Sequence, residues 1–315
     1  MATVTASRPS TVLATRVARR SVRFVRELPI IPLLVLGVLV FVAIFAPLLA
    51  PHGKLDPVPP TREMCQARYG MTHCPYLDNL PPGWFPEGRL DIPLGTDFLG
   101  RDILSRLMHG ARISLVVALT GTLAAGIIGT WLGVLAGYMG RWWDLSIMRI
   151  TDAWLTLPSL VFAILLASVR GPGLWNVVLI LMLVFWSRYT RAVRGEVLSL
   201  RERDFIKLAE INGVRKLRII WRHIIPNVMN TVMVVFSLQI GVAVIIEASL
   251  SFLGVGVPPP EPSWGLMIAQ ERESLLEGRW WLAVFPGFCI TLLVLSANML
   301  GDWLRVRLDP QLRNR

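Results

Sequence analysis

Apolar runs without a charged residue alternate with short charged segments along most of the chain. Six such runs occupy residues 28–51, 113–140, 153–169, 171–187, 224–246 and 280–301. A helix of about 20 apolar residues crosses the roughly 30 Å of hydrocarbon in a bilayer. The pattern therefore predicts an all-α membrane protein with six transmembrane helices. The third and fourth runs are short, and we expect them to extend into flanking residues whose charged ends reach the interface.

A basic, polar segment, residues 204–227, separates the fourth run from the fifth. Its first part places four residues at the i, i+3, i+4, i+7 spacing of one helix face: Phe205, Leu208, Ala209 and Asn212. Gly213 then interrupts the pattern, and a second stripe follows at Leu217, Ile220, Trp221 and Ile224. The segment predicts a short helix, a glycine turn and a second helix, presented outside the membrane for docking. An ordinary loop between two spans is the alternative.

Charge sets the expected orientation. The chain has 315 residues, is 54% hydrophobic and carries a net charge of +11. Six spans put both termini on one side, and that side, with the 204–227 segment, holds 22 Lys and Arg against 9 acidic residues; the opposite side holds 10 against 11. The positive-inside rule places the first side in the cytoplasm. The basic charge then reports orientation and contact with membrane lipid, so nucleic acid is not expected as a partner.

This topology divides the chain into segments. We expect a cytoplasmic basic tail at 1–27, a first transmembrane helix at 28–51 and an extracytoplasmic loop at 52–112. A five-helix core, 113–301, contains a cytoplasmic turn at 141–154, a cytoplasmic segment at 188–223 and an extracytoplasmic segment at 252–279; a cytoplasmic end follows at 302–315. Run 28–51 is too long for the apolar part of a signal peptide, so it predicts a retained anchor.

The extracytoplasmic loop contains two cysteines, Cys65 and Cys74, nine residues apart. On an oxidising face this pair could form a disulfide that contributes about 2 to 3 kcal/mol in the chain-entropy model. Two free thiols are the alternative. The loop lacks the paired spacing of a zinc site.

Polar side chains and small residues mark positions within the spans. Gln239 and Glu247 lie in or at the end of the fifth run, where a carboxylate near hydrocarbon faces either a partner or a water-filled path. They are candidates for a translocation path, and Glu247 could instead reach the interface. The second run carries Gly129, Gly133 and Gly137 at four-residue spacing, which predicts a face for close helix packing.

Motifs for bond chemistry are absent from the sequence. It contains no G-x-x-x-x-G-K-[ST] phosphate loop, no H-E-x-x-H and no G-x-S-x-G, and its four histidines lack ligand spacing. We therefore expect a non-catalytic protein without a cofactor or metal. If ATP drives its function, another protein must hydrolyse the ATP.

Segment 204–227 resembles the EAA loop of ABC importer permeases. The match falls on Asp204, Phe205, Ala209 and Gly213 and closes at His223, Pro226 and Asn227. The chain differs at Lys207 and Leu208, where the family tends to carry an acidic residue and an alanine. Residues 93–115, PLGTDFLGRDILSRLMHGARISL, resemble the C-type subunit of the peptide and nickel branch of that family, as do 248–265 and 301–313.

The resemblance implies a type I ABC importer permease fold whose cytoplasmic coupling helix contacts an ATPase subunit. The residues expected at that contact are Asp204, Phe205, Leu208, Ala209 and Gly213. The implied partners are a second permease, two ATPases and an extracytoplasmic substrate-binding protein, and the implied substrates are peptides or a related solute such as nickel chelates. The competing hypothesis is a stand-alone secondary transporter or channel, which would predict inverted repeats and charges at mid-span.

Overall fold

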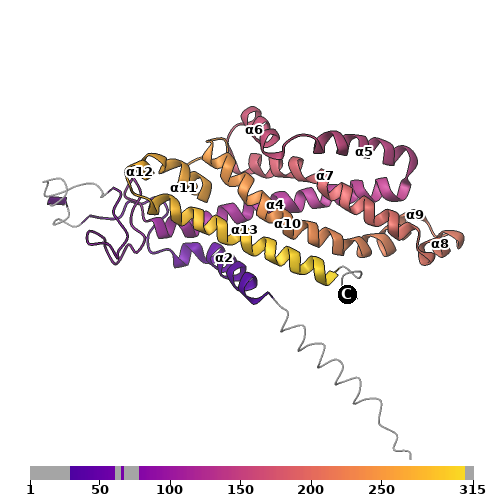
Figure 1. Cartoon of the computed structure of the whole chain (residues 1–315), viewed down its shortest axis with the longest axis horizontal. Coiled ribbons are helices and arrows are strands. Elements are labelled where there is room, and N and C mark those ends of the chain that lie inside the picture. Colours follow the sequence, from indigo (N-terminus) through magenta and orange to yellow (C-terminus); the bar gives the residue numbers. More distant parts are fainter. Residues whose placement is uncertain (1–28, 61–64, 67–77, 309–315) are drawn as a thin grey trace, which may run out of the picture.

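Five long helices form the body of the protein, and the computed structural model describes residues 29–60, 65–66 and 78–308. These helices are α2 (Ile30–Leu49), α4 (Ile103–Val134), α7 (Leu174–Arg201), α10 (Ile225–Phe252) and α13 (Trp281–Leu308). A π-helical turn, η1 (Leu135–Met139), continues α4. Figure 1 shows the five helices running alongside one another. Within the described ranges the chain forms no β-strand, only two isolated bridges.

Short helices occupy the two ends of this bundle. At one end lie α8 (Asp204–Ile211), α9 (Lys216–Ile219) and the π-helical turn η2 (Ile220–Ile224) that leads into α10. At the other end lie α11 (Trp264–Gln270) and α12 (Arg272–Leu276), beside the loop that joins α2 to α4 (Figure 1). We call these the α8 end and the α11 end. The described part thus places the predicted docking segment at one extreme of the bundle.

The predicted third span differs from the structure. Residues 153–169 are divided between α5 (Arg141–Leu155) and α6 (Ser159–Arg170), which are bent by 91° at the break. Pro158 precedes α6, and a proline disfavours helical geometry at the residue before it, here Leu157. Five described helices are long and apolar enough to cross a membrane, or six if the bent pair counts as one span. The predicted turn at 141–154 is likewise wrong, because these residues form α5.

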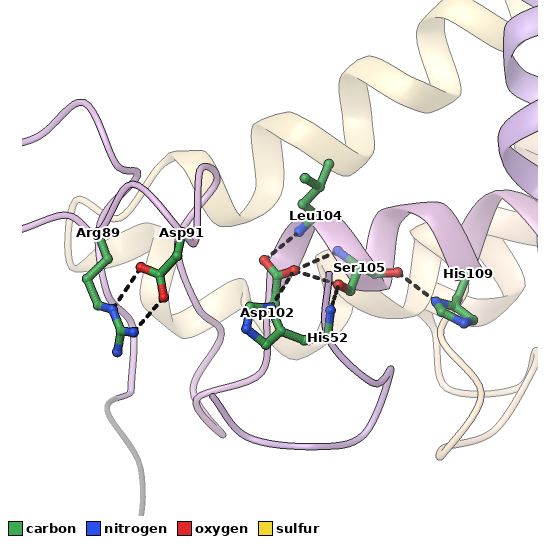
Figure 2. A network of polar contacts seen from close by, with 7 residues as sticks. All are labelled: His52, Arg89, Asp91, Asp102, Leu104, Ser105 and His109. Carbon is green, nitrogen blue, oxygen red and sulfur yellow. Dashed lines mark hydrogen bonds and ion pairs between the residues drawn. The ribbon is translucent and has the colours of Figure 1, made fainter. Parts of the chain in front are cut away.

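The second predicted span begins ten residues earlier than its uncharged run. Asp102 caps α4, since its carboxylate accepts hydrogen bonds from the backbone N–H of Leu104 and Ser105 at 3.2 and 3.1 Å (Figure 2). Ser105 Oγ also donates to this carboxylate at 2.6 Å. The charge of Arg106 does not end the helix, because Arg106 is buried and pairs with Asp97. The residues just before the uncharged run, 103–112, are therefore the first part of α4.

The glycine stripe, which runs along α4 and ends at Gly137 in η1, is a packing face, as the sequence predicts. A Cβ added at Gly129 would lie 2.4 Å from the carbonyl oxygen of Trp186 and 2.5 Å from Tyr189 Cβ. At Gly133 it would lie 2.8 Å from the carbonyl oxygen of Thr190, and at Gly137 2.8 Å from Val197 Cβ. All of these contacts are with α7. The absence of side chains on α4 lets the two backbones approach along much of their length.

Candidate functional site

Ile206 is the buried side chain of helix α8 and anchors this helix to the bundle. Ile206 is fully buried in a cluster built from α4, α7, α9, η1, η2 and α10. Its buried members are Val134, Tyr138, Val193, Val197, Leu200, Ile206, Ile219, Ile220, Ile224 and Val228. The sequence pattern did not single out Ile206, because it lies outside the stripe of Phe205, Leu208, Ala209 and Asn212. Ile206 thus shares one buried cluster with residues of α4, α7 and α10, and this cluster joins α8 to the bundle.

Two polar contacts fix the orientation of α8. Tyr138 Oη, at the end of the α4–η1 segment, donates to Glu210 Oε1 at 3.0 Å. Lys207 Nζ lies 3.0 Å from Glu202 Oε2, just after α7, and this hydrogen bond with the ammonium lowers the pKa of the Glu202 carboxyl. The Glu202 pair is exposed and contributes little to stability. The Tyr138 contact is partly buried, so it is the stronger positional restraint.

The turn after α8 depends on Gly213. The N–H of Gly213 bonds to the carbonyl of Glu210 at 3.0 Å, and that of Val214 to the carbonyl of Ala209 at 3.1 Å. Gly213 has φ = +71°, the left-handed conformation that commonly ends a helix. A Cβ at Gly213 would meet nothing within 4 Å. Backbone conformation, and not crowding, therefore creates the need for glycine here.

The outer face of α8 is apolar and exposed. Phe205, Leu208 and Ile211 are 41%, 57% and 81% exposed, at a spacing of three residues along the helix. Ala209 is partly buried against the Ile206 cluster, and the Asn212 side chain donates to the carbonyl of Leu208 at 2.8 Å. We call Phe205, Leu208 and Ile211 the α8 row. The predicted face is thus divided: Phe205 and Leu208 point outward, Ala209 inward, and Ile211 was missed because it lies outside the i+4 and i+7 positions.

A buried charge cluster joins α4 to α11 at the opposite end. Asp97 pairs with Arg106 and with Arg101, whose Nε lies 2.7 Å away, and Arg106 Nη2 donates to Gln270 Oε1 at 2.9 Å. Glu271 accepts from the backbone N–H of Phe98 at 3.3 Å, and burial raises the pKa of its carboxyl.

A second ion pair lies in the loop before α4. The partly exposed Arg89 guanidinium donates through Nε and Nη2 to the two carboxylate oxygens of Asp91, at 3.0 and 2.5 Å (Figure 2). These hydrogen bonds lower the pKa of the Asp91 carboxyl. Arg89 Nη1 also donates to the carbonyl of Pro59 at 2.9 Å, so the pair joins two parts of this loop.

The two polar candidates for a translocation path lie in α10 and differ in surroundings. Glu247 is fully buried within this chain, where Ser114 Oγ and Ser251 Oγ each donate to its carboxylate at 2.9 Å. Gln239 is 5% exposed and accepts from Arg188 Nη1 at 3.1 Å. Through Ser114, Glu247 links α10 to α4. A role in the path stays a prediction for both residues.

Replacement of Glu247 separates a structural role from a path role. We expect Glu247→Leu to lower the thermal unfolding midpoint in detergent, because two buried hydroxyls lose their acceptor at about 1 to 3 kcal/mol each. Glu247→Gln keeps the shape and an acceptor oxygen, so its midpoint should stay near that of the unsubstituted protein. Glu273→Leu, at an exposed carboxylate of α12, is the control. A Glu247 variant with normal stability but no transport would instead place this residue in the path.

The predicted cysteine pair lies partly outside the described residues. Cys65 is 1% exposed and packs with Val58, Leu80 and Ile92 at the α11 end. Cys74 falls outside the described ranges. The pairing therefore stays a prediction, whereas the third cysteine, Cys289 in α13, is a free thiol.

Mass spectrometry of the unreduced protein tests this pairing. We expect the peptides that contain Cys65 and Cys74 to be linked, with Cys289 alkylated in the same sample as an internal control for access of the reagent under denaturing conditions. Alkylation of all three thiols would show that the bridge is absent.

Comparison with known proteins decides the family. Residues 129–314 match the family model described as binding-protein-dependent transport system inner membrane component. The chain belongs to this family. The matched region contains α7, α8, Gly213 and α10, and it includes the last residues of α4. This inner membrane component is a multi-pass permease subunit of the ABC importer type, and the family match supports this function over the stand-alone transporter or channel considered from the sequence.

Three curated relatives match between 70% and 91% of the chain. It is 39% identical over 90% of its length to the di/tripeptide transport system permease protein DppC of Pseudomonas aeruginosa, covering 88% of that protein. It is 38% identical over 91% of its length to the dipeptide permease protein DppC of Alkalihalophilus pseudofirmus, covering 87%. It is 42% identical over 70% of its length to the glutathione permease protein GsiD of Pectobacterium atrosepticum, covering 73%.

A solved structure has the same fold. The inward-facing MetNI methionine ABC transporter contains a chain that superposes with a TM-score of 0.53 at 14% identity, covering 65% of this inner membrane component and 96% of the MetNI chain. This likeness establishes the permease fold.

In the part of the chain that the structure describes, no group of three or more His, Cys, Asp or Glu residues converges to hold a metal ion.

Proposed function

We propose that this permease carries short peptides across the cytoplasmic membrane as one half of a heterodimeric, ATP-driven importer. The observation that carries the substrate class is the 39% identity to a di/tripeptide permease over 90% of the chain. Related solutes such as nickel chelates belong to the same resemblance and are the second candidate. The chain itself is non-catalytic in this proposal, since its sequence lacks a phosphate loop.

The α8 row is the proposed contact with an ATPase subunit. It presents three apolar side chains at the tip of the bundle, and exposed apolar residues gathered on one face mark a docking surface. Asp204, Phe205, Leu208, Ala209 and Gly213 are the proposed coupling residues: Asp204 complements the helix dipole, Phe205 and Leu208 touch the ATPase, Ala209 packs inward and Gly213 sets the turn.

Movement of the ATPases would reach the membrane bundle through the anchor of α8. Ile206 packs in the cluster shared by α4, α7 and α10, and Tyr138 ties Glu210 to the end of α4. A displacement of α8 would therefore pass through this cluster and the Tyr138 contact to the long helices of the bundle. Nucleotide binding on the ATPases would in this way shift a two-state bundle between outward and inward access.

Sidedness follows from the charge count of the sequence. With both termini and α8 in the cytoplasm, the α11 end faces outward and would receive substrate from an extracytoplasmic binding protein. The exposed apolar surface of α2, which packs mainly on α4 and α13 within the described residues, is available to lipid or to the second permease.

Purification from the native membrane in mild detergent tests this proposal. We expect mass spectrometry to identify a second permease and ATPases with phosphate loops in the same complex. Reconstituted with its binding protein, the complex should take up a labelled dipeptide only when ATP is present. A lone protein, even after crosslinking, or uptake without ATP, would contradict the proposal.

A further inference from the structure

Arg188 places a positive charge deep within the bundle. It is the fifteenth of the 28 residues of α7, about 20 Å from either end of that helix. The next residue, Tyr189, packs against Gly126 and Gly129, which lie at the middle of the uncharged run 113–140 of α4. From the sequence, we expected the charged residues that flank the fourth run, of which Arg188 is the first, to reach the membrane interface. An ionised side chain at this depth is costly and marks a functional position.

Three elements hold the Arg188 guanidinium in place. Nη1 donates to Gln239 Oε1 at 3.1 Å, and Nη2 donates to Ser159 Oγ, at the first residue of α6, at 2.8 Å. The ring of Phe185 lies beneath the guanidinium, with its centroid 5.5 Å from Cζ. The side chain is partly exposed, so it is reachable from outside this chain. The guanidinium is therefore held in position, and part of the Arg188 side chain remains accessible.

Arg188 lacks the carboxylate partner that its neighbours on α7 possess. Arg191 pairs with Asp152 at 2.5 Å and Arg194 with Asp144 at 2.5 Å, both on α5. Among the described residues, no carboxylate lies within ion-pair distance of Arg188. A guanidinium remains charged in proteins and has five N–H donors. The two neutral acceptors here satisfy only part of that capacity.

Gln239 adds further unsatisfied donors. Its Oε1 must face Arg188, because a guanidinium only donates, and this fixes the amide orientation. Its Nε2 is then buried without a hydrogen-bond partner. An unpartnered buried N–H group is costly, and such groups are rare in folded proteins. Arg188 and Gln239 together present N–H donors and one positive charge, the complement of a carboxylate.

We propose that Arg188, positioned by Gln239 and Ser159, binds the carboxylate of the peptide substrate as it passes through the bundle. This inference rests on the proposed import of peptides, because a short peptide with a free C-terminus always carries that group. When a peptide is bound, its carboxylate neutralises the charge of Arg188. When the site is empty, that charge has no such counter-ion. Arg188 thereby becomes a transient substrate site midway along the path.

The test compares Arg188 variants in the whole transporter. The complex is purified with its companion subunits, reconstituted into liposomes and supplied with a labelled dipeptide and its binding protein. We expect Arg188→Gln to reduce uptake about tenfold, Arg188→Glu to reduce it further and Arg188→Lys to retain an intermediate rate. ATP hydrolysis stimulated by the loaded binding protein should stay within twofold of the unsubstituted complex. Arg191→Gln breaks an exposed ion pair on the same helix and should leave uptake unchanged.

Other outcomes overturn the inference. Uptake by Arg188→Gln within twofold of the unsubstituted complex would remove Arg188 from the path. Loss of ATP hydrolysis or of the companion permease together with uptake, in the Lys as well as the Gln variant, would show that Arg188 pairs with a carboxylate of the other subunit. If the unsubstituted complex itself takes up no dipeptide, the proposed function has failed, and this result is distinct from both.

Discussion

Gly213→Val should strongly reduce ATP-driven uptake while leaving the protein inserted in the membrane. Gly213 has φ = +71°, and a left-handed residue other than glycine costs about 1 to 2 kcal/mol, with β-branched side chains the least tolerant. In this variant the backbone of the turn would leave the left-handed conformation, and the α8 row would turn away from its partner. Because about 1.4 kcal/mol corresponds to a factor of ten, this cost predicts uptake about 5 to 30 times below normal, measured in liposomes beside the amount of inserted protein.

Two further variants distinguish conformation from crowding. Gly213→Asn should retain most uptake, because asparagine tolerates the left-handed region and a Cβ at Gly213 meets nothing within 4 Å. Gly195→Val adds the same side chain in open space on α7, at a glycine without a positive φ, and should also transport. If Gly213→Val transports normally, or if Asn is as damaging as Val, the account of this turn is incorrect.

Gly129→Val should destabilise the whole bundle. Its new Cβ would approach the carbonyl oxygen of Trp186 to 2.4 Å and Tyr189 Cβ to 2.5 Å, and a backbone carbonyl cannot move aside as a side-chain end can. Overpacking costs about 1 to 3 kcal/mol in soluble cores, and contact with backbone places this site at or above the upper part of that range. We expect an unfolding midpoint lower by at least about 5 °C in detergent.

Gly37→Val is the matched control for this packing prediction. Gly37 lies in α2, where an added Cβ meets nothing within 4 Å, so the same substitution should leave the midpoint nearly unchanged. Equal midpoints for the Gly129 and Gly37 variants would show that α4 and α7 are not packed as closely as the structure places them.

The sequence predicted the features that local pattern controls. The charge-free runs located α2, α10 and α13, the four-residue glycine spacing identified the α4 face that contacts α7, and Gly213 marked the turn after α8. Each of these follows from helix geometry or from the conformational freedom of glycine. No distant contact is needed to infer them.

Features that depend on distant contacts escaped the sequence. The early start of α4 requires Arg106 to be buried against Asp97 and Gln270, which no local pattern shows. Ile206 became the anchor of α8 because residues of α4, α7 and α10, which lie far apart in the sequence, share one buried cluster with it. From the sequence, Arg188 follows directly after the fourth uncharged run and was therefore expected at the charged end of a span. The hydropathy of α7 alone does not show that Arg188 lies beside the middle of the uncharged run of α4. The bend at Pro158 divided a run that composition presents as continuous.

Site-specific photocrosslinking tests the central claim, that α8 is the contact with an ATPase. A benzophenone amino acid replaces Ile211 on α8, which is 81% exposed, and in a second variant Leu276 on α12, which is 86% exposed at the opposite end of the bundle. After irradiation of native membranes, mass spectrometry identifies the adducts. We predict an ATPase with a phosphate loop attached to position 211 and absent from position 276. An ATPase adduct at position 276, or none at position 211, would contradict the claim.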